Sequence, residues 1–110
     1  MKPTDLVQGT LDMLVLRILA LEPMHGGALS QRLKQMSKDV LQVGPGSLYP
    51  ALHKLEQEGW LTAEWLVSDT KRRVKYYSLT KEGRNQLAGQ TADWKRLSGA
   101  ITAIVVPAEG

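Results

Sequence analysis

The chain has 110 residues, of which 43% are hydrophobic, and its formal net charge at pH 7 is +3. This length corresponds to one domain. The absence of cysteine excludes disulfides and thiolate-bound metals, and it suits the reducing cytoplasm, where we expect the protein to reside. The sequence has no run of about 18 apolar residues and no signal-peptide layout at its start, so we expect no membrane association.

Positive charge is concentrated in the second part of the chain. Residues 1–67 hold six Lys/Arg and seven Asp/Glu, whereas residues 68–110 hold eight and four. The stretch SDTKRRVKYY alone contributes a net charge of +3. Such a local basic patch is typical of a surface that binds phosphate groups. A solvated loop without a partner is the alternative.

The first predicted element is a helix over residues 6–21. Its apolar residues form two stripes at helical spacing, which consist of Leu11, Leu14, Val15 and Ile18, and of Met13, Leu16 and Ala20. A helix that is apolar on so much of its circumference needs two surfaces to pack against. We expect one to be its own domain and the other a second subunit. Burial inside a monomer is the alternative.

Two shorter helices are predicted next. The second follows a turn at residues 22–27, and its apolar face holds Leu29, Leu33, Met36 and Val40. The third follows residues 43–46, where the Ser47 hydroxyl is positioned to cap the helix start and Gly59 to end the helix. Its buried stripe is Leu48, Leu52 and Leu55. Its opposite face carries Ser47, Pro50, His53, Lys54 and Gln57, with Tyr49 at the flank.

Two strands and a long helix complete the chain. Residues 61–67 and 74–79 are rich in β-branched and aromatic residues, which predicts a hairpin with a basic loop over residues 68–73. The last helix is predicted to begin at the N-cap Thr80 and to run to about Val106. Leu87, Trp94 and Ile101 recur every seven residues along it, with Leu97 and Ile104 between them.

This heptad-like seam predicts a homodimer. We expect the interface to consist of Leu14, Leu87, Trp94, Leu97, Ile101 and Ile104. In the alternative, the last helix folds back on its own domain.

The order of elements predicts a mainly α fold with a small β-hairpin. Residues 1–79 are expected to form a winged helix-turn-helix domain, and residues 80–110 a C-terminal dimerisation helix and tail. An α-helix fits the major groove of B-DNA, where base edges are readable, and a basic hairpin tip binds the phosphate backbone. We therefore expect double-stranded DNA as the partner, contacted by Ser47, Tyr49, Pro50, His53, Lys54, Lys71, Arg72, Arg73 and Lys75.

Catalysis finds little support in the sequence. His25 and His53 are the only histidines, and they lie in different predicted elements. No cysteine nucleophile exists, and the acidic residues lack metal-ligand spacing. We expect no enzyme activity, no cofactor and no metal. The competing function is a winged-helix module that binds another protein and not DNA.

The segments VGPGSLYPALHKLEQEGWLTAEW and KRRVKYYSLTKEGRNQL closely resemble the PadR family of bacterial transcriptional regulators. The opening LVQGTLDMLVLRILALEPMHGGALSQRL resembles the first two helices of that family, so the resemblance covers roughly residues 6–106. The length matches the short members, which have one C-terminal helix.

This resemblance implies a homodimeric regulator, commonly a repressor, that binds palindromic operator DNA. It implies that Tyr49 and its neighbours face the DNA and that residues 71–73 touch the backbone, whereas His53 and Lys54 vary among relatives. Family members release DNA in response to signals that include small, often aromatic, molecules. Trp94 is placed to stack on such an effector, and simple packing in the interface is the alternative.

Overall fold

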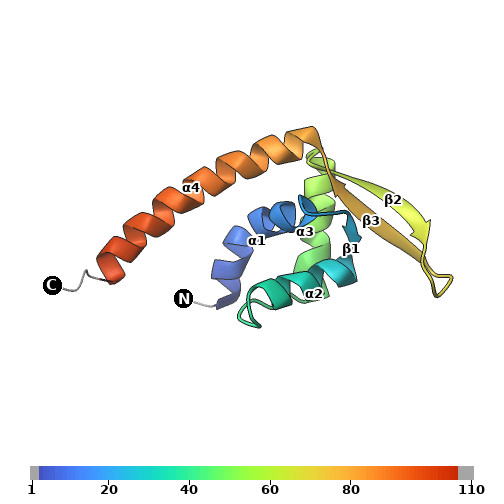
Figure 1. The fold of residues 1–110 in the computed structure, drawn as a ribbon, viewed down its shortest axis with the longest axis horizontal. Coiled ribbons are helices and arrows are strands. Elements are labelled where there is room, and N and C mark those ends of the chain that lie inside the picture. The colour runs from blue at the N-terminus through green and yellow to red at the C-terminus, as the bar shows by residue number, and fades with distance from the viewer. Residues whose placement is uncertain (1–2, 107–110) are drawn as a thin grey trace.

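Four helices and three strands make up residues 3–106, which the computed structural model describes, with side chains described from residue 10 onward. In chain order they are α1 (Pro3–Leu19), β1 (Met24–His25), α2 (Gly26–Met36), α3 (Pro45–Gln57), β2 (Leu61–Val67), β3 (Arg73–Leu79) and α4 (Lys81–Val105) (Figure 1). The predicted winged helix-turn-helix order with a terminal helix is confirmed. Within the described residues, no helix is both long and apolar enough to cross a membrane.

Aliphatic side chains of α1, α2 and α3 form the core. Val15 and Leu16 of α1 are completely buried, because that helix carries two apolar stripes. The buried stripe predicted for α3 is confirmed by Leu48, Leu52 and Leu55, which are at most 2% exposed. Burial of one such side chain stabilises the fold by roughly 1.5–3 kcal/mol. The stripe therefore fixes which face of α3 points away from the core.

Helix α2 is shorter than the apolar pattern predicts. It ends at Met36 with Ser37 as its C-cap, and the next two residues, Lys38 and Asp39, have positive φ angles of 53° and 68°. This left-handed turn takes the chain out of the helix. The assignment of Met36 and Val40 to the apolar face of α2 was wrong, since Val40 lies beyond the helix and the two side chains are 53% and 79% exposed.

The predicted cap of α3 was also wrong. Gly44 is the N-cap, no side chain caps this end, and Pro45 occupies the first turn. Proline suits that position because its fixed φ is helical and its missing N–H would have no partner within the helix. Ser47 therefore lies inside the helix and does not cap it.

The hairpin has the predicted strands, with Arg73 added to the second. Strands β2 and β3 are antiparallel from Leu61 opposite Leu79 to Val67 opposite Arg73. The turn predicted at residues 22–27 contains a third strand, because Met24 and His25 pair with Tyr77 and Tyr76 of β3. The sheet order is β1-β3-β2. A strand of two residues is too short for its own sequence to reveal.

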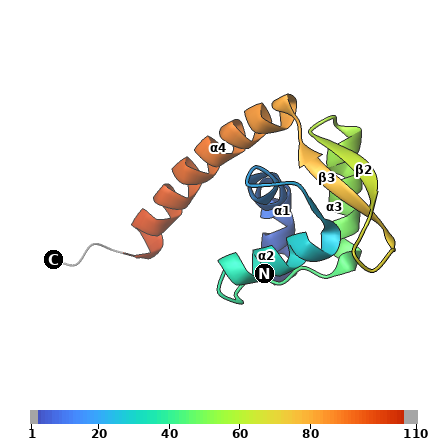
Figure 2. The ribbon, with the colours of Figure 1, turned by 45° about the vertical axis from the view of Figure 1, so that its right-hand side comes forward.

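Helix α4 begins at a joint with the turn between α3 and β2. The Thr80 hydroxyl accepts a hydrogen bond from the Gly83 N–H at 3.0 Å, which confirms the predicted N-cap, and it donates one to the Gly59 carbonyl oxygen at 2.7 Å. Gly59 has a φ of 80°, a conformation that glycine adopts at little cost. Beyond this joint α4 passes α1 and extends away from the other elements (Figures 1 and 2).

Replacement of Gly83 by alanine should destabilise the protein. A Cβ at position 83 would clash with the Trp60 carbonyl oxygen and would lie 2.6 Å from Leu79 Cδ1. We expect G83A to lower the free energy of unfolding by about 2–3 kcal/mol, measured by urea denaturation. A Cβ added at Gly89 of the same helix would meet no side chain within 4 Å, so G89A should raise stability by about 0.5–1 kcal/mol. Equal effects of the two variants would contradict this packing.

Candidate nucleic-acid interface

The exposed half of α3 is bordered by α2 along one edge and by α1 along the other. Tyr49 lies at the edge that meets α2, whereas Ser47, Pro50 and Lys54 line a small pocket of about 150 Å³ with Leu11 and Asp12 of α1. Tyr49, Pro50, His53 and Lys54 are exposed, and Ser47 is half-buried. The structure thus brings the predicted α3 residues to one exposed half of the helix, and Ser47 and Lys54 lie at its α1 edge.

Lys54 is engaged in an ion pair that the sequence pattern did not predict. Its Nζ contacts Asp12 Oδ2 of α1, and the two side chains are 57% and 26% exposed. An ion pair of this exposure adds little to stability. It does hold the Lys54 side chain toward α1, so this cation is less available to an external phosphate than an unpaired one.

Tyr49 packs on the first residue of α2. A Cβ added at Gly26 would lie 2.8 Å from the Tyr49 Cε1 and Oη atoms, so only glycine lets the ring lie this close. One side of the ring is therefore covered by α2, while 49% of the residue remains exposed. Gly26 is therefore a positioning residue for Tyr49, although its sequence context predicts only a turn.

The hairpin loop presents two of the predicted cations at its tip. Lys71 and Arg72 are exposed, and Lys71 has a φ of 62°. Hydrogen bonds within the loop hold it together, since the Ser68 N–H donates to the Arg72 carbonyl oxygen and the Lys71 N–H to the Ser68 carbonyl oxygen, both at 2.8 Å. Its tight turn is thus formed without an Asn-Gly pair.

Arg73 lies at the start of β3, next to the loop. Its guanidinium carbon is 5.1 Å from the centroid of the Trp65 ring on β2, which is a cation–π distance. Both residues are exposed. Stacking on the Trp65 ring holds the Arg73 guanidinium beside the loop and leaves the edge of the guanidinium exposed. Lys71, Arg72 and Arg73 thus form one basic surface, which we call the wing tip.

Lys75 has a different environment from the wing tip. Its Nζ lies 3.0 Å from Glu56 Oε1 of α3, and the two side chains are 30% and 32% exposed. This hydrogen bond raises the pKa of Lys75, partly opposed by burial. The ammonium group also lies 5.4 Å from the Tyr77 ring centroid, and burial raises the pKa of that phenol. Lys75 thus connects the hairpin to α3.

Position along β3 distinguishes Lys75 from the wing tip, because Arg73 and Lys75 share one face of the strand and Lys75 is the nearer of the two to its buried end. Residues two apart share a face of a strand, so Lys75 shares a face with Tyr77, which is 5% exposed. The buried end of that face packs toward α3, whose carboxylate at Glu56 is within reach. Proximity in the chain alone groups Lys75 with the loop cations.

The exposed half of α3 and the wing tip lie on the same part of the molecule, because the hairpin lies beside α3 (Figures 1 and 2). Three packed helices, a small sheet and a protruding basic loop define a winged helix-turn-helix protein. The model of the transcriptional regulator PadR-like family matches residues 15–89 of the sequence. The chain belongs to this family and is therefore a transcriptional regulator.

Individual proteins also match the chain in sequence. A 37.1 kDa protein in a transposon of Streptomyces fradiae is 39% identical over 99 residues, which cover 88% of this chain and 26% of that protein. A transcriptional regulator of Mycobacterium tuberculosis is 43% identical over 63 residues, which cover 57% of this chain and 55% of that protein. The matches thus span about a quarter and about half of the lengths of these two relatives.

Solved structures show the same fold. The crystal structure of a PadR family transcriptional regulator from Eggerthella lenta matches with a TM-score of 0.80 and 33% identity. The match covers 96% of this chain and 89% of that chain. The overlap therefore includes nearly all of the four helices and of the hairpin.

Removal of the Lys75 ammonium should weaken the fold. We expect K75M to lower the free energy of unfolding by about 1 kcal/mol, because Glu56 is left half-buried without its partner. The matched control is K71M at the exposed loop, which should change stability by less than about 0.5 kcal/mol. Urea denaturation of both variants measures the difference, and equal stabilities would show that Lys75 does not connect α3 to the hairpin.

Proposed function

We propose that the protein is a repressor that binds palindromic operator DNA as a homodimer and is released by a small-molecule effector. The observation that carries this proposal is that the hairpin that ends in the wing tip is joined to α3 through the ion pair of Lys75 with Glu56. The wing tip holds three cations, and none of them forms an ion pair within the described part of the chain. Such a surface suits the phosphate backbone.

In this proposal, α3 reads bases from the major groove. Tyr49, Pro50 and His53 are exposed in its first three turns, and no side chain caps its N-terminus, where backbone N–H groups favour phosphate. The acidic Glu56 and Glu58 lie toward the other end, and Glu56 is neutralised by Lys75. The N-terminal half of α3 is therefore the part that suits contact with DNA.

The wing tip supplies affinity rather than sequence preference. Lys71, Arg72 and Arg73 carry charge without acidic partners, and contacts to phosphate fix position while base contacts give specificity. The competing function, a module that binds another protein, requires no such free cations beside a helix face. We therefore favour DNA as the partner.

The apolar seam of α4 supports the homodimer. Trp94, Leu97, Ile101 and Ile104 are 39%, 55%, 48% and 81% exposed, which leaves large apolar side chains in a row along one helix. Contiguous apolar surface of this kind marks an interface. Leu87 and Leu14 are half-buried and pack against the core, so we place them at the inner margin of this interface.

Trp94 is the residue that we assign to effector binding. Its ring is 39% exposed within the seam, so a flat aromatic molecule that inserts between two copies could stack on it. Because such a molecule would alter the packing of the seam, it would change the separation of the two α3 helices and release the DNA.

Loss of the wing-tip arginines should weaken binding to every duplex. For R72A/R73A we expect the slope of log affinity against log salt to fall by about 1 for each lost phosphate contact. Fluorescence anisotropy with duplex DNA at several salt concentrations measures this slope. R96A removes an exposed arginine of α4 that pairs with Asp93, and it should leave the slope unchanged.

Three results would count against this proposal. A wild-type affinity that does not depend on salt would favour the protein-interaction module. An effect of R72A/R73A on one DNA sequence alone would show that the wing tip reads bases. Equal losses in R96A and R72A/R73A would show that net charge, not the wing tip, sets affinity.

Acidic substitutions in the seam should separate the dimer. We expect L97D/I104D to sediment as a monomer at concentrations at which the wild type is a dimer, because charges buried in an apolar seam are costly. Both side chains are exposed in the single chain, so the variant should remain folded, as circular dichroism would verify. A103D, on the opposite side of α4, serves as the control and should stay dimeric. Persistence of the dimer in L97D/I104D would place the interface elsewhere.

A further inference from the structure

Both formal charges of helix α3 are balanced by residues of other elements. Within Pro45–Gln57 the Lys, Arg, Asp and Glu residues are Lys54 and Glu56 alone. The Lys54 Nζ contacts Asp12 Oδ2 of α1, and Glu56 Oε1 lies 3.0 Å from Lys75 Nζ of β3. The helix that we assign to base reading therefore carries no unbalanced charge of its own, in contrast to the wing tip.

The two ion pairs lie at different places on α3. The pair of Glu56 with Lys75 is about one-third exposed at each side chain and connects the helix to the hairpin. Lys54 is 57% exposed and lies one helical turn after the exposed Pro50. Lys54 is therefore the cation of α3 that borders the half of the helix open to a partner.

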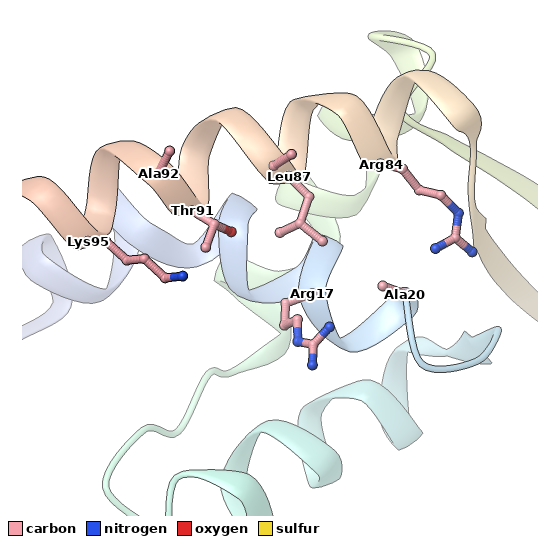
Figure 3. Close-up of a pocket in the computed structure, with 8 residues that line it drawn as sticks. Arg17, Ala20, Arg84, Leu87, Thr91, Ala92 and Lys95 are labelled. Carbon is pink, nitrogen blue, oxygen red and sulfur yellow. The ribbon is translucent and has the colours of Figure 1, made fainter.

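Asp12 faces α3 because of its position around α1. The charged residues of α1 with described side chains are Asp12 and Arg17, and five positions along a helix separate them by about 140° around its axis. Figure 3 shows Arg17 pointing into the space between α1 and α4, together with Arg84 and Lys95. The carboxylate of Asp12 thus serves the α3 side of the helix, where it meets Lys54.

An ammonium group that already has an anionic partner adds little to phosphate binding. To contact a phosphate, Lys54 must leave Asp12, and the exchange places an unpaired carboxylate beside the polyanion. The lost pair and the repulsion between like charges offset the new contact. Binding that ignores sequence comes almost entirely from neutralised phosphates, so the pair removes the contribution that Lys54 would make to it.

We propose that Asp12 limits the sequence-independent binding of DNA by holding Lys54 in this ion pair. Asp12 acts through Lys54, so it is a positioning residue and not a DNA contact. With its charge balanced, α3 discriminates through its exposed Tyr49, Pro50 and His53, while the wing tip supplies the affinity that depends on salt. This inference rests on the proposed function, in which α3 contacts DNA.

The fold has little need of the Asp12 carboxylate. An ion pair of this exposure contributes little to stability, and α1 is anchored by neighbouring apolar residues such as Leu11, which is 2% exposed. Asparagine keeps the shape of the side chain and removes only its charge. D12N should therefore stay folded, as circular dichroism and urea denaturation would verify.

The test measures binding of the full chain to a pool of random-sequence duplexes by fluorescence anisotropy at several salt concentrations. We expect D12N to bind about fivefold or more tightly than the wild type at about 0.1 M salt, and the slope of log affinity against log salt to steepen by about 0.9, because one more phosphate is neutralised. D12E retains the carboxylate and should keep the wild-type slope.

Two further comparisons separate the pair from net charge. D93N frees Arg96 from an ion pair on α4 and changes the net charge by the same amount, but α4 extends away from α3 (Figures 1 and 2). It should change the affinity less than about twofold. In a K54M background, D12N frees no cation at this site, so D12N/K54M and K54M should have the same slope.

Three outcomes overturn the inference: an unchanged slope in D12N, an equal steepening in D93N, or the same steepening when Lys54 is absent. The last would show that the carboxylate acts on DNA directly. A wild type that binds no duplex even at low salt contradicts the proposed function, and this inference with it. Wild-type binding that weakens with salt, together with an unchanged slope in D12N, contradicts the inference alone.

Discussion

Helix α4 carries more apolar surface than its own domain covers, and this constraint shapes the whole molecule. The first turns of α4 pack on α1, but Leu97, Ile101 and Ile104 remain largely in water. At about 25 cal/mol for each Å² of apolar surface, a second copy that covers this row gains several kcal/mol from contacts that a monomer lacks. A short chain buries a limited share of its surface by itself. Burial of the apolar seam against a second copy therefore favours dimerisation.

The seam matters for function because α4 is rigidly joined to the surface that suits DNA. Thr80 hydrogen-bonds to the Gly59 carbonyl oxygen and Gly83 packs on Trp60, so the start of α4 is fixed to the turn that follows α3. On the other side of α3, Lys75 holds the hairpin through Glu56. Helix α3, the hairpin and α4 are thus connected by short-range contacts, so in the proposed dimer the pairing of two α4 helices would fix the relative position of two α3 helices.

The sequence predicts the helices and the hairpin well because their patterns are local. The stripe of Leu48, Leu52 and Leu55 follows the helical period, and the loop cations stand out by composition. Errors occur where a distant contact or a competing local preference decides. Ser47 is displaced from the cap because Pro45 suits the first turn, and the role of Lys75 depends on a carboxylate 19 residues away in α3.

The central claim is that two recognition helices are held in register with two major grooves of one duplex. Selection of bound duplexes from a random pool, followed by sequencing, tests this claim most directly. The account predicts an inverted repeat whose half-site centres are about 10–10.5 base pairs apart, or a multiple of one helical turn. Recovery of a single asymmetric site, or of no enriched sequence at low salt, would contradict it.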